Sequence, residues 1–174
     1  MVSAMAVKKR FPYQAALVAC SGGCRATAEC EYGCVACGLC VGVCKFDAIE
    51  INDLGVAQVN ESKCIACGAC VRECPRELIR IHECANPIVV KCSNKDLGKN
   101  ARKYCEVSCI GCGICEKVCP AGAITISENL SHIDKNYCLS CGQCAVKCPR
   151  GAIADLRGIL TCLLYTSPSP RDTR

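Results

Sequence analysis

The chain has few of the side chains that usually build a protein core. Its 174 residues include no tryptophan, only two phenylalanines and five tyrosines. A core built on aromatic side chains is therefore excluded, and another source of folding free energy is expected. No apolar run reaches the roughly eighteen residues that cross a bilayer. Residues 11–19 form an apolar stretch that is too short for this and follows three basic residues.

Two further absences limit the function. The sequence contains no recognisable Gly-rich dinucleotide fingerprint or other catalytic constellation, so we expect no catalytic site of its own. It also contains no recognisable secretory signal peptide, which favours metal-binding thiols in a reducing compartment over a disulfide framework.

Cysteine, by contrast, is abundant, with 23 residues in the chain. Sixteen of them form four copies of the pattern C-x2-C-x2-C-x3-C, and proline follows three of the copies, at Pro75, Pro120 and Pro149. This is the spacing that holds [4Fe-4S] clusters in bacterial ferredoxins. Structural zinc is the alternative, but it favours two C-x2-C pairs separated by a longer spacer.

The distances between the copies predict how they pair. Three closely spaced thiolates can reach three corners of one cluster, whereas the fourth points to the neighbouring cluster, so the copies must work in pairs. Cys34 and Cys64 are 30 residues apart, Cys109 and Cys138 are 29 apart, and the gap between Cys64 and Cys109 is 45. The predicted ligand sets are Cys34, Cys37, Cys40 and Cys74; Cys64, Cys67, Cys70 and Cys44; Cys109, Cys112, Cys115 and Cys148; and Cys138, Cys141, Cys144 and Cys119.

The predicted fold class is α+β, with two tandem dicluster ferredoxin domains made of short strands, short helices and cluster-binding loops. We divide the chain into a leader with extra cysteines (1–30), a first domain (31–82), a cysteine-containing linker (83–105) and a second domain (106–157). One helical turn and a brief strand are predicted behind every fourth cysteine, at 46–51, 76–81, 121–126 and 150–155. Further strands are predicted at 15–19, 56–59 and 132–134, with a hairpin turn at 52–55.

Aliphatic side chains in these segments are expected to pack beside the clusters and keep water away from them. They are Ile49 and Ile51, Ile79 and Ile81, and Ile124 and Ile126. The two histidines, His82 and His132, are each isolated in the sequence. Structural or solvent-facing roles are predicted for both.

Six cysteines lie outside the four motifs and before the last residues of the chain. They are Cys20, Cys24, Cys30, Cys84, Cys92 and Cys105. One interpretation is that they are free buried thiols, which pack as small apolar side chains. The other is that some of them hold a fifth iron-sulfur cluster or another metal, since free thiols beside clusters invite damaging exchange. The sequence does not indicate which four would serve.

The formal net charge of +5 treats the cysteines as neutral and leaves out the clusters. Four oxidised clusters, each with four thiolates, carry about −2 apiece, which changes the sum to about −3. The basic residues are therefore expected to offset cluster charge. No nucleic-acid partner is predicted, because no basic stripe with interleaved aromatic residues occurs.

Residues 162–174 bear no relation to the repeat and contain two Ser-Pro steps. A disordered tail is one interpretation. Residues 162–172 can also be encoded by the transposase adapter used in short-read library preparation, and we interpret 162–174 as adapter read-through rather than native sequence. Cys162 is then no ligand, and Met1 need not be the native start.

Residues 15–160 resemble the B subunit of the Rnf electron-transport complex. The resemblance rests on Cys20-Ser-Gly-Gly, Tyr32-Gly-Cys34, Cys44-Lys-Phe-Asp-Ala-Ile49, Val90-Lys-Cys92-Ser and Cys109-Ile-Gly-Cys112. The sequence departs from the cysteine pattern at Lys45, which stands where proline ordinarily follows the fourth cysteine. A cation there is expected to raise the potential of the second cluster if it points inward.

The resemblance implies an electron-relay subunit of an anaerobic ferredoxin:NAD oxidoreductase complex, with ferredoxin or other oxidoreductase subunits as partners. It also implies a cytoplasmic protein, or one held at the cytoplasmic face of the membrane by partners or an upstream anchor. A soluble polyferredoxin subunit of another anaerobic redox enzyme is the alternative. A zinc-binding structural module is the alternative that involves no electron transfer.

Overall fold

The computed structural model describes residues 13–22 and 30–158. Within these ranges it contains eight short strands and five short helices. The strands are β1 (Gln14–Val18), β2 (Ile49–Ile51), β3 (Ala57–Val59), β4 (Ile79–Glu83), β5 (Ile88–Val90), β6 (Ile124–Ser127), β7 (Leu130–Ile133) and β8 (Ile153–Asp155). The helices are α1 (Leu39–Gly42), α2 (Ala69–Glu73), α3 (Gly98–Tyr104), α4 (Ile114–Lys117) and α5 (Gln143–Lys147).

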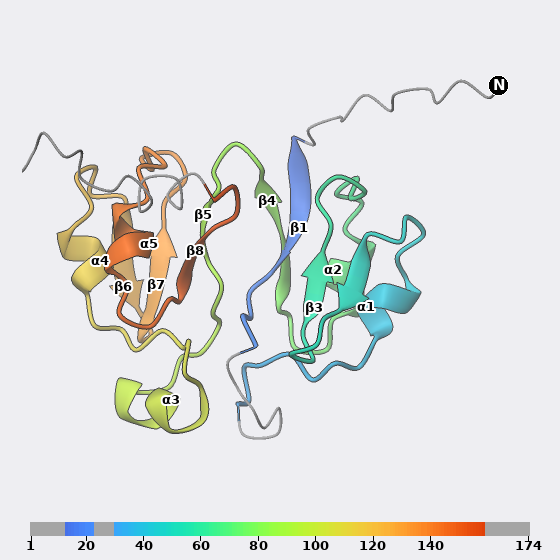
Figure 1. Cartoon of the computed structure of the whole chain (residues 1–174), viewed down its shortest axis with the longest axis horizontal. Coiled ribbons are helices and arrows are strands. Elements are labelled where there is room, and N and C mark those ends of the chain that lie inside the picture. The colour runs from blue at the N-terminus through green and yellow to red at the C-terminus, as the bar shows by residue number, and fades with distance from the viewer. Residues whose placement is uncertain (1–12, 23–29, 159–174) are drawn as a thin grey trace, which may run out of the picture.

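These elements form two lobes, which lie side by side in Figure 1. The first lobe consists of β1 to β4 with α1 and α2, and the second of β5 to β8 with α4 and α5. Helix α3 lies at the bottom of both views, below the second lobe in Figure 1. Each lobe has its own hydrophobic core, so the α+β class with two units agrees with the structure.

The first lobe contains two antiparallel strand pairs. Strand β1 pairs with β4 from Gln14 opposite Glu83 to Val18 opposite Ile79, and β2 forms a hairpin with β3. The hairpin turn lies at 52–55 as predicted: the Asn52 side-chain oxygen accepts hydrogen bonds from the Leu54 and Val56 amides at 3.1 and 3.0 Å. A side chain that bonds its own backbone two residues on is typical of such turns.

The second lobe repeats this topology. Strand β5 pairs antiparallel with β8, and β6 forms a hairpin with β7. Strands β1 and β5 lie in the predicted leader and linker, and each pairs with the last strand of the lobe that follows it. The first and last strands of each lobe are therefore neighbours, which closes each lobe around its two cysteine motifs.

Four of the helices begin at the same point of the cysteine motif. Gly38, Gly68, Gly113 and Gly142 precede them with φ of 76, 73, 71 and 71°. Each glycine lies just before the residue that precedes the third cysteine, so the chain turns there and presents that cysteine from the first turn of a helix. A positive φ of this size favours glycine, because other residues pay a steric cost.

The helical turns predicted behind the fourth cysteines are wrong. Those segments are non-helical turns, and the helices precede the fourth cysteine instead. The cause is a left-handed residue three positions after each fourth cysteine, which interrupts a right-handed helix. These residues are Asp47, Glu77, Gly122 and Gly151, with φ of 48, 52, 59 and 61°. The brief strands predicted after these turns are confirmed as β2, β4, β6 and β8.

The cores contain cysteine in place of aromatic side chains. The third cysteine of every motif is buried, and Ile49, Ile79 and Ile124 are buried beside them. The second isoleucines differ: Ile81 and Ile126 pack against the cores while half-buried, whereas Ile51 is 37% exposed. The prediction that Ile51 shields a cluster is therefore wrong: Ile51 is the last residue of β2, and it packs against neither core.

Candidate iron-sulfur cluster sites

The first cavity brings together the first predicted ligand set. Cys34, Cys37, Cys40 and Cys74 line a space of about 370 Å³, together with Val18, Leu78 and Ile79 from the core. Three of these cysteines come from one motif and Cys74 comes from the next. This is the crossing that the spacing predicts for a pair of cubane clusters.

A second cavity shows the reciprocal crossing. Cys64, Cys67 and Cys70 line it with Cys44, the fourth cysteine of the first motif, and the space is about 330 Å³. Ala16 of β1 and Ile49 of β2 supply apolar walls. The two cavities of the first lobe therefore exchange their fourth cysteines.

The second lobe has a matching cavity of about 340 Å³, lined by Cys109, Cys112, Cys115 and Cys148. For the last predicted set, Cys144 is buried. Burial raises its pKa, and the charge of Cys138 raises it further, which shows that the two sulfurs are near each other. The Ala123 amide donates to Cys119 Sγ at 3.4 Å. Ligation by all sixteen cysteines remains a prediction, but in the structure three of the four sets each line a cavity.

The loops between the first and second cysteines also share one conformation. Residues two positions after the first cysteine are left-handed: Ala36, Ala66, Gly111 and Ser140 have φ of 51, 57, 62 and 52°. Turns that alternate in hand create concave nests of backbone N–H groups, which favour anions such as iron-sulfur clusters. Two amides, those of Ala16 and Ala66, already donate to Cys64 Sγ, both at 3.4 Å.

Burial raises the pKa of the innermost thiols. The pKa of Cys70 and of Cys144 is about 11, because burial disfavours the thiolate and neighbouring cysteines add repulsion. Burial likewise raises the pKa of Cys40 and Cys115. Iron must therefore displace protons from these sulfurs when it binds, and binding should couple strongly to folding. The thiol donors, apolar walls and N–H groups all fit iron-sulfur clusters.

The six cysteines outside the motifs separate into groups. Cys20, Cys30, Cys92 and Cys105 line one further cavity. Cys84 lies elsewhere, and Cys24 falls outside the described residues. Sequence reasoning did not identify which four meet, although Val18-Ala-Cys20-Ser and Val90-Lys-Cys92-Ser could have shown it as a repeated motif.

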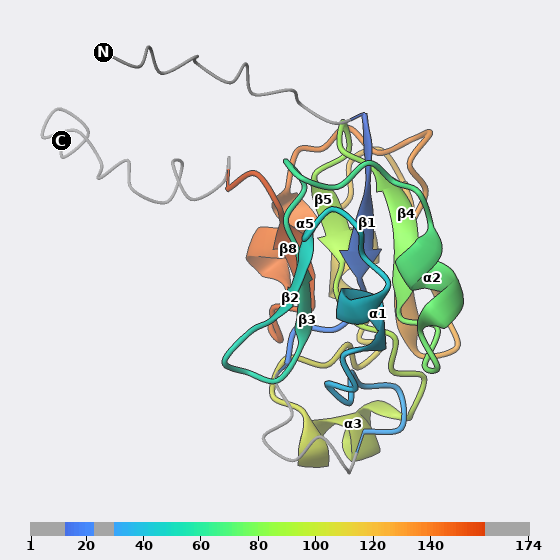
Figure 2. The same ribbon diagram turned by 90° about the vertical axis from the view of Figure 1, so that its right-hand side faces the viewer.

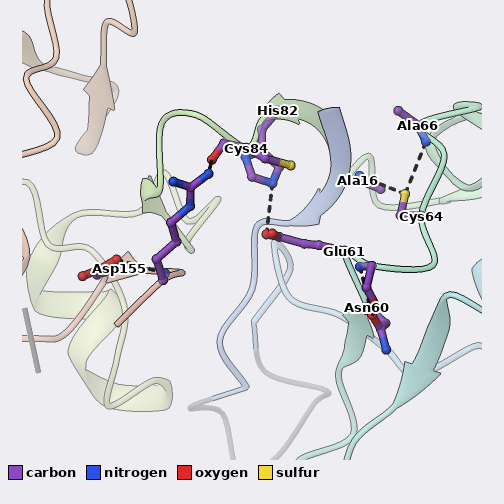
Figure 3. A network of polar contacts seen from close by, with 10 residues as sticks. Ala16, Asn60, Glu61, Cys64, Ala66, His82, Cys84 and Asp155 are labelled. Carbon is purple, nitrogen blue, oxygen red and sulfur yellow. Dashed lines mark hydrogen bonds and ion pairs between the residues drawn. The ribbon is translucent and has the colours of Figure 1, made fainter. Parts of the chain in front are cut away.

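Cys84 lies beside His82 and Glu61, as Figure 3 shows. One ligand atom from each of the three lies within 4.8 Å of the others, and His82 Nε2 is 3.6 Å from a Glu61 carboxylate oxygen. Burial lowers the pKa of His82. Of the two roles predicted for His82, the solvent-facing one is wrong, because its side chain is only 3% exposed, whereas a structural role agrees with this burial. The short spacing His82-x-Cys84 at the end of β4 was the signal for their contact. His132 is exposed, as predicted.

Comparison with known protein families decides the assignment of the fold. A model described as a 4Fe-4S dicluster domain matches residues 33–78 and 108–152, together more than half of the chain, and a second model of that description matches 63–123. The chain belongs to the 4Fe-4S dicluster domain family. Its iron-sulfur character is therefore established at the level of the family.

Three relatives are B subunits of ion-translocating complexes. That of the Na(+)-translocating ferredoxin:NAD(+) oxidoreductase complex of Acetobacterium woodii is 42% identical over 60% of this chain and 32% of its own. That of the ion-translocating oxidoreductase complex of Methanosarcina acetivorans is 41% identical over 64% and 42%. That of the proton-translocating ferredoxin:NAD(+) oxidoreductase complex of Clostridium ljungdahlii is 44% identical over 62% and 38%. The resemblance to the B subunit of Rnf is confirmed as sequence similarity.

The dicluster chain spans less than half the length of these relatives. A solved formate dehydrogenase–heterodisulfide reductase–formylmethanofuran dehydrogenase complex from Methanospirillum hungatei contains a chain that is 21% identical, with a TM-score of 0.28 over 74% of this chain and 52% of that one. Among the described residues, no helix has the length and apolar character needed to cross a bilayer.

Proposed function

We propose that the chain relays single electrons through four [4Fe-4S] clusters, as a component of an oxidoreductase complex similar to Rnf. The crossing of the fourth cysteines carries this proposal, since Cys74 joins the cavity of the first motif and Cys44 joins that of the second. Crossed ligation is the arrangement by which ferredoxins hold two clusters close together.

The ligands we propose are those of the predicted sets. They are Cys34, Cys37, Cys40 and Cys74 for cluster one; Cys64, Cys67, Cys70 and Cys44 for cluster two; Cys109, Cys112, Cys115 and Cys148 for cluster three; and Cys138, Cys141, Cys144 and Cys119 for cluster four. Three of these sets each line one cavity, and in each cavity three cysteines of one motif meet the fourth cysteine of its partner, which supports equal occupants.

Clusters of this kind, when bound, accept and release one electron at a time. The chain supplies everything else: thiolates fix the positions, buried aliphatic residues such as Leu78 and Ile79 exclude water, and amides stabilise negative charge on the sulfurs. For each electron that the donor loses, the acceptor gains one electron. No side chain needs to exchange a proton or form a bond with a substrate.

We propose other redox proteins as the partners. The relatives' names include ferredoxin and NAD(+), which supports a ferredoxin as donor and further oxidoreductase subunits as acceptors. We also propose that the chain works in the cytoplasm, or at the cytoplasmic face of a membrane through partners or an upstream segment. Because the repeated cysteine motifs fix only the cofactor, a soluble polyferredoxin subunit of another redox enzyme is the second candidate.

The test is reduction of the full chain, purified without oxygen, by reduced ferredoxin. We expect the visible absorbance of the clusters to bleach, and to return when an electron acceptor is added. A matched chain loaded with zinc should show no change. Zinc with little sulfide in the native chain, or clusters that ferredoxin cannot reduce, would contradict the relay. Co-purification with membrane subunits would separate the Rnf-like role from that of a soluble polyferredoxin.

A further inference from the structure

The two lobes carry a second repeated motif outside the ferredoxin pattern. Val18-Ala-Cys20-Ser begins at the last residue of β1, and Val90-Lys-Cys92-Ser begins at the last residue of β5. The Ala19 amide donates to the Leu78 carbonyl at 2.8 Å, and the Lys91 amide donates to the Ala152 carbonyl at 2.9 Å. Each bond extends the pairing of the first strand with the last strand of its lobe. Cys20 and Cys92 therefore occupy equivalent positions.

Cys30 and Cys105 form a second equivalent pair. Each lies four residues before the first cysteine of its lobe and is followed by glutamate, as Cys30-Glu-Tyr-Gly-Cys34 and Cys105-Glu-Val-Ser-Cys109. An arginine that follows a motif proline holds each segment: Arg76 donates to the Glu31 carbonyl, and Arg150 donates to the Cys105 carbonyl. All four cysteines thus belong to the repeat.

Two reciprocal hydrogen bonds join the lobes at these cysteines. Ser21 Oγ donates to the Lys91 carbonyl at 3.1 Å, and Ser93 Oγ donates to the Ala19 carbonyl at 3.1 Å. Because Ser21 matches Ser93 and Ala19 matches Lys91, the contact has approximate twofold symmetry. It brings the Cys20 and Cys92 segments of the two lobes face to face.

The four cysteines line one cavity, as the motif cysteines of three predicted sets line theirs. Cys30, Cys92 and Cys105 are buried, with 5, 8 and 8% of their surfaces exposed, and Cys20 is half-buried. The cavity draws two cysteines from each lobe.

Hydrogen bonds to these sulfurs resemble those at the motif cysteines. Cys92 Sγ accepts from the Cys109 amide at 3.3 Å and from the Asn94 amide at 3.5 Å. The Asn94 side-chain nitrogen also lies 4.0 Å from Cys30 Sγ, and Asn94 is only 2% exposed. Cys64, in a motif, likewise accepts from two amides. Such donors stabilise a ligating thiolate.

We propose that Cys20, Cys30, Cys92 and Cys105 hold a fifth [4Fe-4S] cluster between the two lobes. Sulfurs around a single zinc ion lie about 3.8 Å apart, as bond lengths of about 2.3 Å require. In the described part of the chain, three ligand atoms lie within 4.8 Å of one another only at Glu61, His82 and Cys84. The four sulfurs are spread more widely than zinc needs, as are the motif cysteines, and a multi-iron cluster fits that spread.

The site itself depends only on its four cysteines, whereas its use as an electron bridge between the lobes rests on the proposed relay. An electron that passes from one lobe to the other would first reduce the fifth cluster by one electron. The cluster would return to its oxidised state when that electron moves on to the other lobe. Without such a site, electrons would have to pass directly from a cluster of one lobe to a cluster of the other.

The test compares the full chain with a double variant, Cys20→Ser and Cys105→Ser, which removes one ligand from each lobe. These residues are chosen because Cys92 also contacts the Cys109 amide, so that its loss could disturb the second lobe. Cys84→Ser is the matched control, since Cys84 is a buried cysteine outside the cavity. Iron and acid-labile sulfide per chain are measured without oxygen, with Mössbauer spectra and spin counts after reduction.

We expect about twenty iron and twenty sulfide in the native chain and in Cys84→Ser, and about sixteen in the double variant. About sixteen in the native chain, or no loss in the double variant, would overturn the fifth site. One zinc beside sixteen iron would overturn its cluster form. If the double variant loses all its iron through misfolding, the native count of about twenty or sixteen still decides.

The outcomes separate this proposal from the relay itself. About sixteen iron atoms per native chain, all in reducible clusters, would overturn the fifth cluster and leave the four-cluster relay intact. Little iron or sulfide in any form of the chain would contradict the relay.

Discussion

The two lobes share one backbone plan, yet they surround equivalent sulfurs with different side chains. Ala57 pairs with Ile51 in the first hairpin, and Ser131 pairs with Ile126 in the second. Ala57 lines the cavity of Cys40, whereas Ser131 is buried with its hydroxyl 3.4 Å from Cys115 Sγ. A methyl group in one lobe thus stands where the other has a hydroxyl that can donate to a ligating thiolate.

This difference indicates a division of roles within the repeat. The repeated loops and glycines fix where the cysteines lie, so they set which cluster binds. Single residues beside the sulfurs then adjust each site, because hydrogen bonds to sulfur change reduction potential. Substitutions in the repeated loops and glycines should therefore affect both lobes alike, whereas substitutions beside the sulfurs should affect the two lobes differently.

Removal of iron should have the largest effect, and it should affect both lobes. The cores contain buried cysteines in place of aromatic residues, so ligation is expected to supply much of the folding free energy. We expect an iron chelator under reducing conditions to abolish most amide-exchange protection and far-UV circular dichroism. Reconstitution with iron and sulfide is the control. If the second lobe kept its amide-exchange protection without iron, the two lobes would not depend equally on their clusters.

Gly38→Ala should destabilise the first lobe by about 1 kcal/mol, because alanine is strained at a φ of 76°. A Cβ at Gly38 would meet no atom, so the cost reports backbone conformation alone. Gly42→Ala is the matched control, since Gly42 lies in helix α1 and is equally open. It should be neutral or slightly stabilising. The midpoint of thermal bleaching measures both; equal midpoints would refute the role of Gly38.

Gly113→Ala extends this test to the second lobe. Gly113 has a φ of 71° and precedes α4 as Gly38 precedes α1. A similar loss of about 1 kcal/mol is expected. A large difference between Gly38→Ala and Gly113→Ala would show that the shared plan is not equally stable in the two lobes.

Ser131→Ala and Ala57→Ser should shift cluster potentials in opposite directions. A hydroxyl that donates to a ligating sulfur stabilises the more negative, reduced state and so raises the potential. Ser131→Ala should lower the potential of cluster three by tens of millivolts, where about 59 mV is tenfold for one electron. Ala57→Ser should raise that of cluster one. Redox titration followed by electron paramagnetic resonance measures both, and equal signs would contradict the interpretation.

Lys45→Pro should have the smallest effect. The condition for a shift was that the cation points inward, but Lys45 is exposed, so water and salt screen its charge. The change in the potential of cluster two should be smaller than that caused by Ser131→Ala. A larger shift would show that the lysine does act on the cluster.

The sequence predicted the parts of the site that depend on local spacing. The four motifs, their pairing and the strands after each fourth cysteine follow from fixed intervals along the chain. The position of the helices could not be predicted in the same way. Asp47 and Glu77 adopt left-handed backbone conformations, which an aspartate or a glutamate in a sequence does not indicate. Glycine marks the equivalent turns in the second lobe only.

The meeting of Cys20, Cys30, Cys92 and Cys105 was harder to predict. It depends on the contact of Ser21 with Lys91 and of Ser93 with Ala19, which join residues 70 and 74 positions apart. The spacing between Cys20 and Cys30 also differs from that between Cys92 and Cys105, which hides the repeat. The contact of Glu61 with His82 and Cys84 is likewise set by the fold rather than by one motif.

The most direct test of the relay is a stepwise reductive titration of the native chain, with the spin concentration compared with iron, zinc and acid-labile sulfide. The account predicts iron and sulfide in equal amounts and one reducible spin for about every four iron atoms. Spectra broadened by coupling between close clusters would match the crossed ligation of each lobe. Zinc in place of iron, or iron without sulfide and without reducible spins, would contradict it.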